Sequence, residues 1–234
     1  MINYEKKNKY ITILKLTIKI IISVIIILLL FFGSAGTFYW IEAWLLIILF
    51  ILYVGFFLFW LKKNNPELLK ERTSRKKEGK LWDKIILTIC TISLIFMFII
   101  CGFDAVRFKW TMMPFILKII GFIGYIPAAI LIFLTVRENK YLSEVVRIQN
   151  DRSHQVVKTG PYKYIRHPMY LAIIFIIILT PFALGSFIAL FFSGFIIILF
   201  IIRTYLEDKT LQNELTGYKD YIREVRYRLF PGIW

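Results

Sequence analysis

Cysteine and histidine are scarce in this chain, with two of each among 234 residues. Cys90 and Cys101 fall in one apolar run, where we expect them to pack rather than to form a metal cluster or a useful disulfide. His154 and His167 stand apart in sequence, and two separated histidines do not make a metal site. We therefore predict neither a metal centre nor a disulfide framework.

Acidic residues are also few, since 15 Asp and Glu stand against 30 Lys and Arg, a net charge of +15. Hydrophobic residues make up 59% of the chain, whereas soluble domains contain roughly half. A basic surplus in a chain with long apolar runs is typical of loops that stay in the cytoplasm and face anionic lipid, and not of nucleic-acid binding. We expect an integral membrane protein that contacts membrane lipids and binds no nucleic acid.

The sequence also lacks internal repeats, a Rossmann-sized loop and a clear signal-peptide cleavage motif. Apolar runs instead predict an all-α polytopic membrane bundle of about six transmembrane helices. The expected spans cover residues 20–32 with their flanks, a second run to about 61, and then 85–103, 114–136, 168–182 and a run to about 202.

Basic residues gather in the N-terminal tail, in two long loops (62–84 and 137–166) and in the tail 203–234. An even number of spans places all of these segments, and both termini, in the cytoplasm. Runs of Ile, Lys and Asn indicate an AT-rich bacterial source, so we expect the bacterial plasma membrane.

One polar, turn-rich stretch interrupts the apolar runs: HQVVKTGPYKYIRHPMY, from His154 to Tyr170. Gly160 followed by proline favours a turn. Pro168 pushes His167 towards an extended backbone and suits the first position of a helix. The stretch should therefore end at a helix N-terminus on the membrane surface, where free N–H groups and the helix dipole favour an anionic ligand.

The tail supplies a second group of charged residues. Arg203 and Glu207 are four residues apart and share one helix face, whereas Asp208 points about 100° away. A surface ion pair would be worth little, but a charge directly after a membrane span marks a candidate functional site. Gly217 is expected as a helix C-cap, and three later arginines as contacts to lipid head groups: Arg223, Arg226 and Arg228.

The order HxVxxxGPYxxxRHPxY, an apolar hairpin, RxxxEDxxL and GYxxY resembles the isoprenylcysteine carboxyl methyltransferase family. This is a membrane branch of the S-adenosylmethionine-dependent methyltransferases, related to the phospholipid N-methyltransferases. The flanking segments NPELLKER, WDK, ENKYLSEVVRIQ and RLFPGIW look like those of bacterial members. The resemblance divides the chain into N-terminal scaffold helices (1–114) and a methyltransferase core (115–234).

The resemblance implies S-adenosylmethionine as cofactor, S-adenosylhomocysteine as product, and a cytoplasmic cofactor site in the C-terminal half. Arg203 and Glu207 would be catalytic residues bordering the methyl acceptor, with Arg203 suited to a carboxylate. Asp208, where the family commonly has a second Glu, is a departure that shortens the reach of that carboxylate. The implied cofactor-binding residues are His154, Gly160, Tyr162, Arg166, His167, Pro168, Tyr170 and Glu207.

Three functions fit the sequence. In the first, methyl transfer reaches a carboxylate on a lipophilic or lipidated acceptor that enters from the bilayer. A phospholipid N-methyltransferase is the second. The third is a non-catalytic transporter or scaffold, although a transporter is expected to show repeats and ionisable groups near the bilayer midplane.

Overall fold

The computed structural model describes residues 22, 24–73 and 79–234. Every regular element within these residues is helical, which confirms the predicted all-α class. The α-helices are α2 (Ile41–Asn64), α3 (Pro66–Thr73), α4 (Leu81–Gly102), α5 (Phe115–Glu138), α6 (Pro168–Leu184), α7 (Ala189–Glu214) and α8 (Tyr218–Glu224). Short π or 3₁₀ turns are η1 (Leu29–Gly33), η2 (Phe103–Arg107), η3 (Asn150–Arg152) and η4 (Gly160–Lys163).

Within the described residues, four helices are long and apolar enough to cross a membrane: α2, α4 continued through η2, α5 and α7. Two shorter apolar helices, Val24–Gly33 and α6, fall where the first and fifth spans are expected. The beginning of that first span and the basic N-terminal tail lie outside the described residues. Four predicted spans are therefore confirmed as span-length helices, and the total of six stays a prediction.

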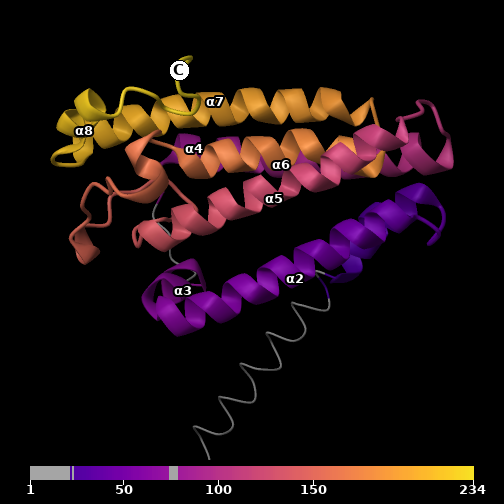
Figure 1. The fold of residues 1–234 in the computed structure, drawn as a ribbon, viewed down its shortest axis with the longest axis horizontal. Helices are drawn as coiled ribbons and strands as arrows, with labels where there is room; N and C mark the ends of the chain where they lie inside the picture. The colour runs from indigo at the N-terminus through magenta and orange to yellow at the C-terminus, as the bar shows by residue number, and fades with distance from the viewer. Residues whose placement is uncertain (1–21, 23, 74–78) are drawn as a thin grey trace, which may run out of the picture.

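Helix α2 runs along the outside of the bundle formed by α4, α5, α6 and α7 (Figure 1). Its sequence is apolar on all sides, and among its residues only Ala43 and Leu61 are buried. A helix that is hydrophobic all round yet exposed in the folded chain suits a lipid environment. The structure thus agrees with the expected membrane location.

Small residues allow α5 and α6 to approach closely. A Cβ added at Gly121 would lie 2.8 Å from the Ala183 Cα, so only a hydrogen fits there. Small residues at helix crossings in membranes allow backbones to pack at short range. Cys90 and Cys101 are free and buried in the core, as predicted.

A buried carboxylate ties together the far end of the bundle, where α6 turns into α7. Asp104 accepts hydrogen bonds from the Thr111 backbone N–H and hydroxyl, both at 2.7 Å, and from the Ser186 hydroxyl at 2.6 Å. Gly185, at φ 88°, supplies the left-handed residue that ends α6 in this turn. Because a buried carboxylate needs such donors, Asp104 holds the loop before α5 against the α6–α7 turn.

The opposite end, which we call the site end, is where α4 and α6 begin and α5 and α7 finish. The long loop 139–167 and helix α8 both lie there (Figure 1). They are joined by the Tyr221 hydroxyl, which donates to the Tyr162 carbonyl at 2.6 Å. Loop 139–167 and α8 therefore meet in space, although α6 and α7 lie between them in the sequence.

The contact at Gly121 predicts a stability effect. Gly121→Ala should destabilise the protein by about 1–3 kcal/mol, because the added methyl overlaps the α6 backbone. Gly194→Ala in α7 is the matched control, since a Cβ there meets nothing within 4 Å. Thermal unfolding in detergent should show a lower midpoint for Gly121→Ala alone, and equal midpoints would contradict the close packing.

Candidate functional site

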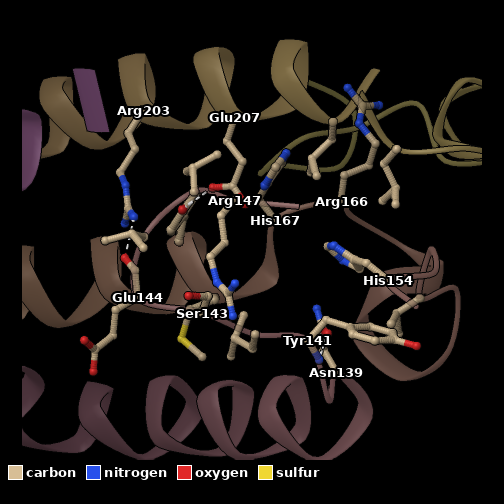
Figure 2. A pocket seen from close by; sticks show the side chains of 18 of the residues that line it. Asn139, Tyr141, Ser143, Glu144, Arg147, His154, Arg166, His167, Arg203 and Glu207 are labelled. Atoms are coloured by element: carbon tan, nitrogen blue, oxygen red, sulfur yellow. Dashed lines mark hydrogen bonds between the residues drawn. The ribbon is translucent and has the colours of Figure 1, made fainter. Parts of the chain in front are cut away.

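A cavity of about 460 Å³ lies at the site end of the bundle (Figure 2). Its walls come from the start of α4, loop 139–157, η4, the start of α6, the end of α7 and α8. Its volume falls within the range of about 300–1,000 Å³ of small-molecule sites. Seven of the predicted site residues line it: His154, Tyr162, Arg166, His167, Tyr170, Arg203 and Glu207.

The remaining two predicted site residues, Gly160 and Pro168, shape the backbone around the cavity. Gly160 adopts φ +57° at the start of η4, and a Cβ there would lie 2.9 Å from the Glu138 Cδ. The turn after Gly160 buries Tyr162, whose hydroxyl accepts a hydrogen bond from Asn139 at 2.8 Å. The predicted Gly-Pro turn is therefore confirmed, and its contribution is to aim Tyr162 at the cavity.

Pro168 is the first residue of α6, and His167 is its N-cap with φ −126°, as predicted. The backbone N–H groups of Arg166 and His167 are not open to an anion, however. They donate to the carbonyls of Tyr227 at 3.0 Å and Arg228 at 2.9 Å. Carbonyl groups of the C-terminal tail therefore occupy the backbone N–H donors just before α6.

Asp208 is the fully buried centre of a polar network. Arg166 binds it with two nitrogens, Nε at 2.8 Å and Nη2 at 3.0 Å. His167 lies 3.2 Å from Asp208 Oδ1, and the Arg228 Nε donates to Oδ2 at 3.0 Å. The Tyr218 hydroxyl adds a bond of 2.9 Å. One carboxylate therefore joins α7 to the start of α6, to α8 and to the tail.

The network also engages two arginines that the sequence places elsewhere. Arg166 gives Asp208 and the carbonyls of the tail four of its five N–H groups; it lines the cavity, and its role in cofactor binding stays a prediction. Arg228, expected at lipid head groups, instead faces Asp208. The prediction that Gly217 caps the end of α7 is wrong, because Leu215 is the C-cap of α7 and Gly217 is the N-cap of α8.

Burial and then the Asp208 carboxylate raise the pKa of Tyr218 well above its usual value. The phenol therefore stays protonated and remains a donor to Asp208. Burial also lowers the pKa of His154 to about 4, with the Arg152 and Arg147 charges acting in the same direction. His154 is neutral near pH 7 and packs on Tyr141, with the ring centroids 4.6 Å apart.

Arg203 has a buried partner that lies 120 residues away in sequence. Its Nε donates to Asp83 Oδ1 at 2.7 Å and its Nη2 to the Glu144 carbonyl at 2.8 Å. The guanidinium carbon also lies 4.9 Å from the centroid of the Tyr170 ring. The prediction that a charge at this depth requires a partner agrees with the structure, and the partner is Asp83 of α4.

Glu207 lies one turn after Arg203, and both residues line the cavity from the same face of α7, as predicted. The Tyr170 hydroxyl donates to Glu207 Oε2. Tyr170 therefore contacts both charged residues, Glu207 through its hydroxyl and Arg203 through its ring.

The loop before the His154–Tyr170 stretch contributes side chains that were not predicted as site residues. The Ser143 hydroxyl is buried at the cavity and has no hydrogen-bond partner within the described residues. The Arg147 side chain also reaches into the cavity (Figure 2). The only sequence signal for this loop was the family-like segment ENKYLSEVVRIQ, which did not assign a role to any single residue.

The Asp208 network predicts a large effect on the tail. Asp208→Asn should lower the free energy of unfolding by about 3–5 kcal/mol, because it leaves buried guanidinium groups without a counter-charge. Asp220→Asn is the matched control, since its ion pair with Arg223 is exposed and is worth about 1 kcal/mol or less. Limited trypsin digestion should release the C-terminal tail faster in Asp208→Asn alone, and identical digestion of both variants would contradict the role of Asp208.

Comparison with known proteins agrees with this geometry. The isoprenylcysteine carboxyl methyltransferase (ICMT) family matches residues 122–213, which include the cavity residues from His154 to Glu207. The chain is also similar to the uncharacterized protein YpbQ of Bacillus subtilis (strain 168), with 39% identity over 59 residues. That match covers 25% of this chain and 35% of the relative. Residues 122–213 therefore match the predicted isoprenylcysteine carboxyl methyltransferase family, and the resemblance is confirmed over this part of the chain.

Proposed function

We propose that the protein transfers a methyl group from S-adenosylmethionine to a carboxylate on a lipophilic acceptor. The observation that carries this proposal is the joint presence of Arg203, Glu207 and the His154–Tyr170 motif around one cavity. Residues 115–234 would supply most of this core. Helix α4, from the segment predicted as scaffold, adds Leu87 and Thr91 to the cavity wall.

Polar and aromatic residues of the cavity wall fit S-adenosylmethionine. The buried Ser143 hydroxyl lacks a partner in the described part of the chain, and Glu207 offers a carboxylate to ribose hydroxyls or to a cation. Tyr162 and the neutral His154 offer flat faces for a purine ring. When bound, the cofactor supplies a methyl group already activated on a sulfonium, so the chain has to position and desolvate the partners.

Apolar side chains in the cavity wall suit the acceptor. They are Leu87 of α4, Ile173 of α6 and Phe200 of α7, which would contact a hydrocarbon chain arriving from the bilayer. The Arg203 guanidinium carbon lies 6.0 Å from the centroid of the Phe200 ring, and its Nη1 donors make no hydrogen bond with the described residues. These donors suit an acceptor carboxylate, which attacks as an anion and needs no general base.

Phospholipid N-methylation is the alternative that the charges support. Asp83 already balances Arg203, and Glu207 adds a second carboxylate beside them. Such a site tolerates a cationic amine, which must lose a proton before it can attack. A transporter or scaffold would use neither the cofactor nor an acceptor, so binding experiments separate it from both enzymes.

For each of these three functions we place the protein in a bacterial plasma membrane with both termini in the cytoplasm.

Cofactor binding is the first test. Wild-type protein in detergent should bind S-adenosylhomocysteine saturably by calorimetry, and Glu207→Gln should weaken binding about 10- to 100-fold, the effect of losing a charge-assisted hydrogen bond. Glu224→Gln is the matched control, because Glu224 pairs with Lys158 at the surface outside this cavity. Folded wild-type protein that does not bind would rule out the methyltransferase proposal.

The nature of the acceptor is tested at Arg203. Arg203→Lys keeps the positive charge but loses the Nη1 donors that suit the acceptor carboxylate, so methylation of an isoprenylcysteine acid should fall at least about tenfold. Methylation of phosphatidylethanolamine, which offers an amine, should not depend on these donors. Arg223→Lys, at an exposed position, serves as control. Equal activity of Arg203→Lys and wild type on the acid would exclude the carboxylate grip.

A further inference from the structure

We propose that Asp83 is a positioning residue that keeps Arg203 apart from Glu207, so that each can bind a different ligand. This inference rests on the proposed function, in which Glu207 serves the cofactor and Arg203 the acceptor. Asp83 is distant in sequence from both residues and lies outside the family match at 122–213.

Arg203 and Glu207, the two oppositely charged residues of α7 in the cavity, are expected to attract each other. Arg203 and Glu207 are four residues apart on one helix face, the spacing at which opposite charges attract. Both already contact Tyr170, Arg203 over the ring and Glu207 at the hydroxyl. Direct pairing would place the guanidinium on the carboxylate and would leave neither group for a ligand.

Asp83 opposes this pairing because it binds Arg203 itself. Its side chain is fully buried, and Oδ1 accepts the Arg203 Nε at 2.7 Å while Oδ2 lies 3.4 Å from Nη2. The pair is buried on both sides, with the Arg203 side chain 5% exposed and that of Asp83 not exposed at all. A low-dielectric setting makes this interaction stronger than a pair in water, so Asp83 determines the direction in which Arg203 points.

The carboxylate is itself held in place. The Val146 backbone N–H donates to Asp83 Oδ2 at 2.8 Å, and the Glu144 carbonyl accepts the Arg203 Nη2 at 2.8 Å. Loop 144–146 therefore closes a ring of contacts from α4 through the loop to α7. Three groups restrain the guanidinium in this arrangement: Asp83, Glu144 and the Tyr170 ring. Such preorganisation lowers the ordering cost when an acceptor binds.

A double-mutant cycle on S-adenosylhomocysteine binding tests the inference without a known acceptor. In Asp83→Asn, Arg203 loses its counter-charge and should turn to Glu207, which then competes with the cofactor. Binding should weaken about tenfold, the ratio that 1.4 kcal/mol of competing interaction produces. In the Glu207→Gln background Arg203 has no Glu207 carboxylate with which to pair. Asp83→Asn should therefore change S-adenosylhomocysteine binding less than about twofold.

The cycle separates positioning from a loss of structure. A purely structural role of Asp83 would weaken binding by the same factor in both backgrounds, and that result, or no effect of Asp83→Asn in either background, would overturn the inference. Intrinsic fluorescence and thermal unfolding confirm that each variant is folded. Asp220→Asn, an exposed carboxylate near the tail, should leave binding unchanged. Wild-type protein that fails to bind would instead overturn the proposed function, and this inference with it.

Discussion

Buried arginines at the site end require buried carboxylates, and this requirement determines how the chain closes there. A guanidinium removed from water without a counter-charge is strongly destabilising. Arg166 meets Asp208 and Arg203 meets Asp83, and all four side chains are at most 5% exposed. Each pair joins segments that are far apart in sequence. Together the pairs hold the start of α4, the start of α6 and the end of α7 around one cavity.

The two pairs have different consequences for chemistry. Asp208 and two carbonyls of the tail together take up four of the five N–H groups of Arg166, and Asp208 also binds Arg228 and Tyr218, so this network holds the tail against the cavity wall. The Asp83 pair leaves the Nη1 donors of Arg203 without a hydrogen bond to the described residues. The Asp208 network thus keeps part of the cavity wall rigid, and Arg203 offers its Nη1 donors to a ligand. This combination suits a reaction in which the protein mainly positions two partners.

Local sequence patterns predicted the local features of the site. Pro168 and Gly160 act through backbone geometry within a few residues, so the helix start and the turn could be inferred from the sequence. The common face of Arg203 and Glu207 follows from helix periodicity alone. Four of the spans also follow from apolar length, while α6, at 17 residues, is shorter than the about 20 residues that usually cross a bilayer.

Long-range pairing could not be predicted in the same way. Asp83 and Arg203 are separated by 120 residues, and no periodicity links them. Asp208 was interpreted only as a shortened carboxylate turned away from Glu207, because its partners come from α6 and the tail. Arg228 was assigned to lipid for the same reason: a basic tail residue looks exposed until the fold supplies a buried acid.

Methyl transfer itself tests the proposed function most directly. The purified protein would be incubated with S-adenosylmethionine carrying a tritiated methyl group, together with bacterial membrane lipid or an isoprenylcysteine acid. Because a methyl ester is cleaved by base and an N-methyl group is not, methylation of a carboxylate should place label in the organic phase that base releases as volatile methanol. Label that resists base would contradict a carboxylate acceptor, and no transfer by protein that binds the cofactor would contradict the proposed reaction with these acceptors.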